Sequence, residues 1–492
     1  MESTSTIAAN GIAAPLPVQA NRLRPGVLGA GAITFLVISA ASPLVGIAGG
    51  FPVAMLLGNG AGLPLALCLA VSILLAFAAG YTAMARHLSN AGGFYAITSQ
   101  GIGGTAGSAS AMIALVSYNC MQIGIYGMFG VAASGLVQDI AGISLPWWLY
   151  VFGAIGAIAI LGYRQVDLSM KVLLALVVGE FIGVLLLDIS ILKSGGAAGF
   201  DFTSFTPAAF FSGSPAIGLL FCFASFVGFE ATTIYSEEAR NPERTIPLAT
   251  YLSVLIVGVF YAFSVWCMVV GAGAEGLVET IAELGNPVAF TFGLSDRFAG
   301  SWLTLLLRIL FVSGVFAGLL AFHNTTARYF YTIGRDGLLP GRLGTTHSKH
   351  QSPHAGSVCQ TTIAASVILV FALAGADPIL TLFSWLTNVG TLGILVLMTI
   401  ASVAVILFFR NHRELAGNAW RTLVLPAAAG VAFALIAALA VYRFDLLTGA
   451  SKALSMLLPA LVLAAVVAGI VLATLLRSRD PRRFDQLGRH KV

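Results

Sequence analysis

Two carboxylates lie inside long apolar stretches of this 492-residue chain, and their positions suggest chemistry. Glu230 follows Gly228 in residues 221–247, a segment that begins apolar and aromatic and ends as a dense run of charges. Glu180 lies nine residues after Lys171 in another apolar stretch. An ionisable group at membrane depth costs roughly 3 kcal/mol or more, so both are functional-site candidates if these stretches cross a bilayer.

The composition predicts that they do. Hydrophobic residues make up 58% of the chain and charged residues 9%, and the mean hydropathy is +0.93. A soluble domain has roughly a quarter of its residues charged, so lipid must cover much of this surface. The five cysteines have neither metal nor disulfide spacing, and we interpret them as small packing residues.

Apolar runs of roughly 20 residues predict transmembrane helices, and the chain contains about twelve. They span residues 28–56, 62–85, 105–137, 146–163, 169–192, 209–236, 246–271, 301–332, 355–374, 379–409, 420–441 and 454–476.

The basic residues orient these helices. Of the 25 lysines and arginines, only Lys193, Arg297, Arg443 and Lys452 fall in predicted outer loops, and Arg308 falls inside a helix. The other twenty lie on the inner side, which is the asymmetry expected of a membrane protein with cytoplasmic termini. Residues 1–26 are predicted to be a disordered tail and 478–492 a basic tail. The net charge of +5 therefore reports orientation, and we expect no nucleic-acid partner.

Two helices carry signs of a break. The first contains Ser42-Pro43 followed by glycines at 46, 49 and 50, a cluster that can open a helix. The alternative is a kinked, closely packed helix. The sixth run is apolar up to Gly228 and more polar after it.

Corresponding breaks in two halves are a pointer to a transporter binding site. The two broken runs are five helices apart, and that odd spacing means that the second set of five enters the membrane from the opposite side. The spacing therefore predicts inverted repeats.

Three segments resemble the amino acid–polyamine–organocation (APC) transporter superfamily. Gly228-Phe229-Glu230 with residues 236–247 resembles its sixth-helix signature. Residues 86–95, an arginine and then Ala-Gly-Gly before an aromatic pair, resemble its motif after helix two. Residues 327–340, with Gly334-Arg335-Asp336-Gly337, resemble its motif after helix eight.

The resemblance implies an all-α membrane protein with the LeuT-type fold. Residues 27–193 would form the first five-helix repeat, 205–409 the inverted second repeat, and 420–477 two additional helices. In the family, amides at a Gly-Ser-Gly-type break in helix one hold an amino acid carboxylate. Here 45–50 reads Val-Gly-Ile-Ala-Gly-Gly without the serine, so an amine without a carboxylate stays open as the substrate.

Residues near the two breaks and on the neighbouring helices are the predicted substrate contacts. They are Ser42, Val45, Gly46, Ala48, Gly49, Gly50, Asn119, Gln122, Phe223, Ala224, Phe226, Gly228 and Trp385. Helix–helix hydrogen bonding would equally explain Tyr118, Asn119, Gln122 and Asn388, and core packing would explain Phe221, Phe223, Phe226 and Trp385.

The carboxylates are assigned to proton coupling and gating, with alternatives. Glu230 is interpreted as a proton-linked gate or as an anchor for unwound backbone, or else as a purely structural carboxylate. Glu180 would carry the coupling proton, face a cationic amine, or pair with Arg308. Asp188 is expected to be solvated near the outer end of its helix. The charge run of Glu237, Glu238, Arg240, Glu243 and Arg244 is a solvated loop or an inner gate against Arg86 or 328–335.

The leading hypothesis is a permease that imports amino acids or related amines by proton symport with alternating access. An exchanger and a polyamine- or amine-specific permease are the alternatives. The sequence lacks GxxxxGK[ST] and paired catalytic residues, so we expect no enzyme, cofactor or metal site; the proton is the expected coupling ion, with sodium not excluded. We expect a multi-pass protein of the plasma membrane, the bacterial inner membrane, whose partners are lipid, a small-molecule substrate and, as an open question, a second copy of the chain.

Overall fold

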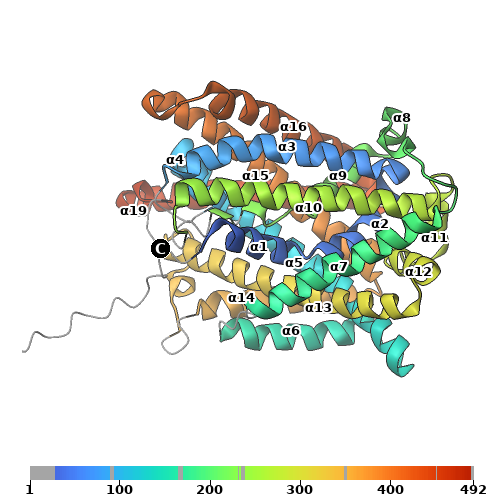
Figure 1. Ribbon diagram of the computed structural model, residues 1–492. Helices are drawn as coiled ribbons and strands as arrows, with labels where there is room; N and C mark the ends of the chain where they lie inside the picture. Colours follow the sequence, from blue (N-terminus) through green and yellow to red (C-terminus); the bar gives the residue numbers. More distant parts are fainter. Residues whose placement is uncertain are drawn as a thin grey trace, which may run out of the picture.

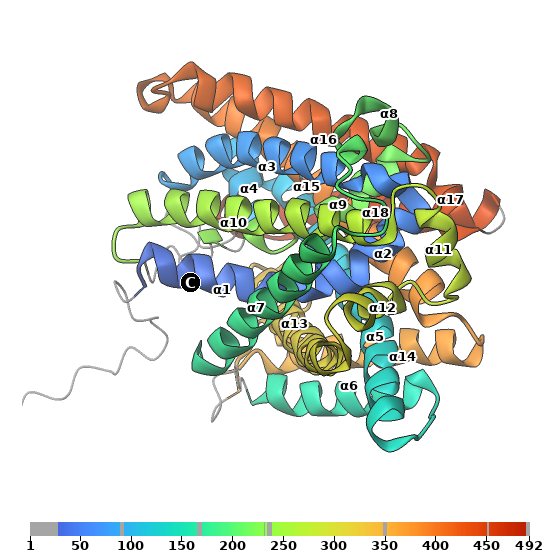
Figure 2. The ribbon, with the colours of Figure 1, turned by 45° about the vertical axis from the view of Figure 1, so that its right-hand side comes forward.

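The architecture is a bundle of long helices, seen in a computed structural model that describes residues 28–88, 93–164, 170–230, 232–233, 239–347, 352–449 and 452–488. Across these ranges no β-strand occurs, and one isolated parallel bridge joins Leu28 to Ala239. Figures 1 and 2 place α16 and α6 on opposite sides of the bundle. In Figure 1, α4 and α19 lie at one end and α8, α11 and α12 at the other.

Helices occupy every one of the twelve predicted apolar runs. The long ones are α3 (Leu63–Ala85), α5 (Gly104–Ala141), α6 (Trp147–Tyr163), α7 (Met170–Ser194), α10 (Pro242–Ala272), α13 (Ser301–Arg335), α14 (His354–Leu373), α15 (Ser384–Asn411), α16 (Leu425–Tyr442) and α18 (Lys452–Arg479). Among the described residues, nine helices are long and apolar enough to cross a membrane; Ala30–Ser39, Trp147–Tyr163 and Pro215–Ala224 are shorter apolar helices.

The first and sixth runs are interrupted near their middle, whereas the tenth and eleventh only begin with a π-helical turn, η7 (Pro378–Phe383) and η9 (Trp420–Val424). The first consists of α1 (Ala30–Ala41), the π-helical η1 (Val45–Gly50), α2 (Phe51–Ala54) and the π-helical η2 (Met55–Asn59). The sixth forms α9 (Pro215–Ala224), and residues 225–228 continue it as a turn. Both predicted interruptions are therefore present.

Several short helices lie in segments that the hydropathy pattern left as loops. They are α4 (Gly93–Gly101), α11 (Leu277–Glu283), α12 (Ala289–Phe298), α17 (Phe444–Thr448) and α19 (Pro481–Asp485), and α8 (Pro207–Phe210) lies across the start of the sixth run. Too short to span a bilayer, they carry no apolar run of the length used to find membrane helices.

The core is built around α5, which packs against α15, α18, α13, α4 and α6. It contains a run of small residues, and small residues let helices approach closely in the absence of a hydrophobic driving force from water. A Cβ built at Gly124 would lie 2.7 Å from a Thr387 side-chain atom, and one at Gly127 would lie 2.3 Å from the Pro378 carbonyl oxygen. These glycines therefore fix how closely α5 approaches η7 (Pro378–Phe383) and α15.

Two half-helices also contact each other through their backbones: η2 of helix one and α9 of helix six. Both lie toward α8 and α11. A Cβ built at Gly58 would lie 2.8 Å from the Gly218 Cα atom, and the Ser214 amide donates to the Gly58 carbonyl at 2.8 Å. No side chain separates η2 from α9 at this point.

Candidate functional site

A cavity lies where the two broken helices meet α5, α13 and α15. Its volume is about 70 Å³. A cavity needs roughly 10–15 Å³ to hold one water, so this one has room for about five to seven waters or a small molecule in their place. The lining residues are Ala41, Ser42, Val45, Gly46, Gly50, Met121, Ile125, Phe221, Ala224, Ser225, Val227, Val315, Gly318, Phe322, Phe383 and Thr387.

The break in helix one begins at Ser42. Its φ of 41° lies in the left-handed region, and the following Pro43 has no backbone N–H to continue the ladder. The Ser42 amide still donates to the Ile38 carbonyl at 3.1 Å, which ends α1. The Leu44 amide, the first donor after the proline, has left the α1 ladder.

Glu180 from α7 takes up that amide. The Leu44 N–H donates to Glu180 Oε2 at 3.1 Å, and the Ser42 hydroxyl lies 3.0 Å from Oε1 and 3.2 Å from Oε2. The side chain is only 1% exposed. Because Ser42 also lines the cavity, Glu180 lies directly behind the cavity wall and contacts it through the serine.

Gly314 of α13 packs directly against this carboxylate. A Cβ built at Gly314 would lie 2.4 Å from Glu180 Oε1 and 2.5 Å from the Ser42 oxygen. Contacts of that length are far inside van der Waals distance, so a glycine is needed here for α13 to approach the pair. Ser42 at the break in helix one, Glu180 of α7 and Gly314 of α13 therefore meet at one point.

The break in helix six is held by Glu230. The Gly228 amide donates to Glu230 Oε2 at 2.9 Å, and Gly228 has a φ of 108°, a conformation that a side chain would strain. The Tyr118 hydroxyl of α5 donates to Glu230 Oε1. Glu230 is 2% exposed, and its backbone carbonyl accepts from Thr233 Oγ1 at 3.0 Å.

Each break therefore presents an amide to a buried carboxylate. Glu180 comes from a separate helix, whereas Glu230 belongs to the broken segment itself. The Glu230–Gly228 contact is one that an anchor for unwound backbone would make, and the roles of Glu230 as anchor, gate or structural carboxylate stay predictions.

Five of the thirteen predicted substrate contacts line the cavity. They are Ser42, Val45, Gly46, Gly50 and Ala224. The other eight, Ala48, Gly49, Asn119, Gln122, Phe223, Phe226, Gly228 and Trp385, are not lining residues in this conformation, and their role in binding stays a prediction.

Most of these eight have other neighbours. Gln122 donates to the Leu319 carbonyl at 3.3 Å and accepts from Gln360, and Asn119 donates to the Leu115 carbonyl at 2.8 Å. The aromatic rings pack edge-on: Phe223 against Phe433, Phe226 against Tyr261, Trp385 against Phe371. A Cβ at Gly49 would meet Met128 at 2.4 Å. Ala48 is fully buried.

Sequence reasoning missed the lining residues on the unbroken helices. Met121 and Ile125 lie four residues apart on α5, and Phe383 and Thr387 show the same spacing across η7 and α15. This spacing places each pair on one helix face, and it can be read from the sequence. The spacing alone did not identify these residues as cavity residues because their helices are apolar on nearly every face.

The structure excludes one alternative for Glu180 and contradicts one expectation for Asp188. Arg308 lies near the start of α13 and its Nη1 atom is 2.8 Å from Asp139 Oδ2, so the alternative that it pairs with Glu180 is excluded. Asp188, expected to be solvated, is 1% exposed and accepts from the Ser264 hydroxyl at 2.6 Å. The expectation for Asp188 was wrong because distance from a helix end along the sequence does not show which neighbour covers that end.

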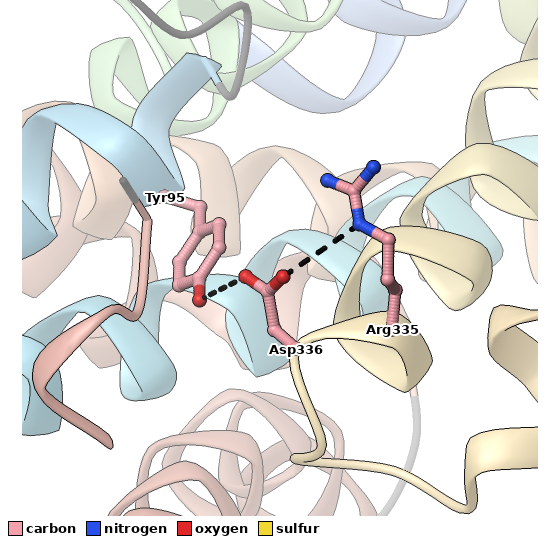
Figure 3. Close-up of polar contacts among 3 residues, drawn as sticks. All are labelled: Tyr95, Arg335 and Asp336. Carbon is pink, nitrogen blue, oxygen red and sulfur yellow. Dashed lines mark hydrogen bonds and ion pairs between the residues drawn. The ribbon is translucent and has the colours of Figure 1, made fainter. Parts of the chain in front are cut away.

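Two of the recognised motifs meet at the opposite side of the bundle from α8 and α11. Tyr95 in α4 donates to Asp336 Oδ2 at 2.7 Å, and Arg335 Nε lies 3.9 Å from Asp336 Oδ1 (Figure 3). Asp336 is buried. This contact closes α4 onto the end of α13, and charge-assisted hydrogen bonds of this kind are among the stronger ones.

The predicted charged gate falls partly beyond what can be described. Glu237 and Glu238 lie outside the described residues. Arg240 donates its backbone amide to the Leu28 carbonyl at 2.9 Å, and Glu243 and Arg244 are exposed in the first turn of α10. In the described part of the chain, no three His, Cys, Asp or Glu side chains are grouped so as to hold a metal ion.

Known proteins resemble this chain over different lengths. The branched-chain amino acid permease BcaP of Bacillus subtilis is 28% identical over 195 residues, which are 39% of this chain and 38% of that protein. The low-affinity putrescine importer PlaP of Escherichia coli is 24% identical over 324 residues, 63% of this chain and 66% of that protein. The methylthioribose transporter of B. subtilis is 27% identical over 196 residues, 39% of this chain and 38% of that protein. The matches thus span less than two thirds of each relative.

The family match extends further along the chain. Residues 28–471 match the amino acid permease family, a stretch that contains both broken helices, the carboxylates Glu180 and Glu230 that bind them, and every residue that lines the cavity. It agrees with the three motifs and with the all-helical architecture. The chain therefore belongs to the amino acid permease family, within the APC superfamily of membrane transporters.

Proposed function

We propose that this protein is a secondary active transporter that imports an amino acid or a related amine together with protons. One observation carries the proposal: a small cavity lies between two broken helices, and a buried carboxylate binds a backbone amide at each break. Broken helices with a site between them are the arrangement that alternating-access transporters use. The relatives support amino acids or amines, since they are named for branched-chain amino acids and for putrescine.

Coupling would run through Glu180 and Ser42. When Glu180 is ionised it can only accept hydrogen bonds, so the Ser42 hydroxyl hydrogen points at the carboxylate and the Leu44 amide is held. When Glu180 is protonated it becomes a donor, and it can donate to the Ser42 oxygen. The serine hydrogen is then free to turn into the cavity, where Ser42 is a lining residue.

This exchange ties proton binding to substrate binding. A protonated Glu180 releases one donor to the substrate at the break, and a bound anionic group would stabilise that arrangement. By linkage, each ligand then raises the affinity for the other by the same factor. Glu230 is assigned to a second role, as the anchor of the helix-six break and a gate, with Tyr118 as its hydrogen-bond donor.

The proposed direction of transport, into the cell, rests on the orientation that we expect in the bacterial inner membrane. With both termini cytoplasmic, the Tyr95–Asp336 contact lies on the cytoplasmic side and the Gly58–Gly218 contact lies on the outer side. An inward proton gradient would drive uptake, as the substrate and its proton enter from outside and leave after the inner contact opens.

Uptake into proteoliposomes with an imposed pH gradient tests the proposal. An inward proton gradient should accelerate uptake of the transported amino acid or amine in the unaltered protein. Glu180→Gln, which keeps the shape and mimics the protonated carboxyl, should still exchange substrate but should lose the acceleration. A gradient that has no effect on the unaltered protein, or the same effect on Glu180→Gln, would refute the coupling role.

Exchange is the second candidate, and the same vesicles distinguish it. An obligate exchanger takes up labelled substrate only when unlabelled substrate has been loaded inside. Uptake into empty vesicles that responds to the proton gradient would favour symport.

A further inference from the structure

We infer that the cavity selects a substrate with an uncharged, apolar side chain, and that Gly318 sets the size limit of that side chain. The inference rests on the proposed function, because it narrows the substrate class of the same site. It bears on a point on which the relatives differ, since they are named for branched-chain amino acids, methylthioribose and putrescine.

The first argument is charge. Among the described lining residues none is ionisable as an acid or base, and the polar side chains are those of Ser42, Ser225 and Thr387. The two nearby carboxylates already accept hydrogen bonds within the protein: Glu180 accepts from Ser42 and Leu44, and Glu230 accepts from Gly228 and Tyr118. Neither is a lining residue.

The broken helices can still meet one charge of each sign. The amides at the start of a half-helix favour an anionic group, and the carbonyls at the end of a half-helix favour a cationic one. A zwitterionic head group would face the start of the half-helix at Pro43 and the end of α9 at Ala224, and would be met there by the two helix dipoles. A further ammonium or guanidinium in the side chain would be buried without a counterion, which is costly.

The second argument is the character of the wall. Ten lining residues are apolar: Ala41, Val45, Met121, Ile125, Phe221, Ala224, Val227, Val315, Phe322 and Phe383. Such a wall gains free energy by covering an alkyl or thioether side chain and offers hardly any polar partner to a charged one. Discrimination between apolar side chains must then come from space.

Space is open at Gly318. A Cβ built there would meet no atom within 4 Å, although the residue lines the cavity. Gly46 also lines the cavity, but a Cβ there would meet the Tyr261 ring at 2.9 Å. Gly50 is open too, yet it belongs to the π-helical segment of the break. On the regular helices of the wall, Gly318 is thus the described glycine whose side chain would enter free space and subtract from a cavity of about 70 Å³.

The test uses purified protein in proteoliposomes, with uptake of alanine and leucine and competition by arginine and putrescine. In the unaltered protein, leucine should compete for alanine uptake, and arginine and putrescine should compete at least about tenfold less well. Gly318→Val should raise the KM for leucine about tenfold or more relative to the KM for alanine. Gly318→Ala, the smaller change, should shift the ratio in the same direction.

The control is Gly156→Val on the exposed face of α6, where a Cβ meets no atom within 4 Å; it should leave the ratio unchanged. Competition by arginine or putrescine as strong as by leucine would overturn the charge argument. Equal loss of alanine and leucine uptake in Gly318→Ala would overturn the size argument. If a folded, unaltered protein takes up none of the four compounds, the proposed function itself fails, which is a different result.

Discussion

Replacing Gly314 by alanine tests the link between Glu180 and the broken helix without changing a single polar group. The added Cβ would lie 2.4 Å from Glu180 Oε1 and 2.5 Å from the Ser42 oxygen. An ordinary contact is about 3.4 Å or longer, so the carboxylate must retreat by about 1 Å. The Leu44 and Ser42 hydrogen bonds, now 3.0 to 3.2 Å long, would then exceed hydrogen-bonding distance.

The expected effect follows from the value of those bonds. A hydrogen bond to a charged group contributes roughly 1.5–3 kcal/mol, and about 1.4 kcal/mol corresponds to a factor of ten. Losing even one of these bonds should therefore lower proton-coupled uptake by roughly 10- to 150-fold. Overall stability should fall less, because alanine is favoured over glycine inside a helix by about 1 kcal/mol.

The assay compares gradient-driven uptake with exchange at equal pH on both sides. Gly314→Ala should lose most of the first and retain more of the second. Gly156→Ala, in open space on α6, is the matched control and should behave as the unaltered protein does. If Gly314→Ala keeps its full response to the pH gradient, Glu180 does not act through the break and the reasoning fails.

Three further changes probe the other contacts. Tyr118→Phe removes the hydroxyl donor to Glu230 and should lower the maximal uptake rate about tenfold or more; an unchanged rate would show that the anchor does not need it. Asp336→Asn weakens the contact that closes α4 onto α13, so a thiol-reactive reagent added from the side of the termini should label Ser225→Cys faster than in the unaltered background, and an equal rate would contradict this role. Arg308→Ala breaks a partly exposed ion pair and should change the free energy of unfolding by no more than about 1 kcal/mol, with the pH-gradient response intact; loss of that response would mean that Arg308 does influence the coupling carboxylate.

The elements and both breaks could be predicted because their signals are local. A proline beside a serine, a glycine before a carboxylate and twenty apolar residues in a row each act on their own backbone or on the bilayer around them. Glu230 was found in this way, and its amide partner Gly228 lies only two residues away.

The partners of Glu180 and Arg308 could not be predicted because they depend on how neighbouring helices are rotated. Glu180 binds residues 136 and 138 positions earlier in the chain. In soluble proteins a polar stripe marks the face of a helix that meets water. Helices in lipid are apolar on the outer and the inner face, so the sequence of α13 does not mark Gly314 and Gly318 as wall residues.

The close approach of Gly58 and Gly218 has a mechanical consequence. With backbone on backbone and the Ser214 amide bound to the Gly58 carbonyl, η2 and α9 cannot slide past one another without losing that contact. We expect the two half-helices to move together as one rigid body, so that the gate on that side opens about a single hinge. A disulfide or a bulky residue that stiffened the η2–α9 contact would leave this joint movement possible. A substitution that forced η2 and α9 apart would keep the site partly open on that side.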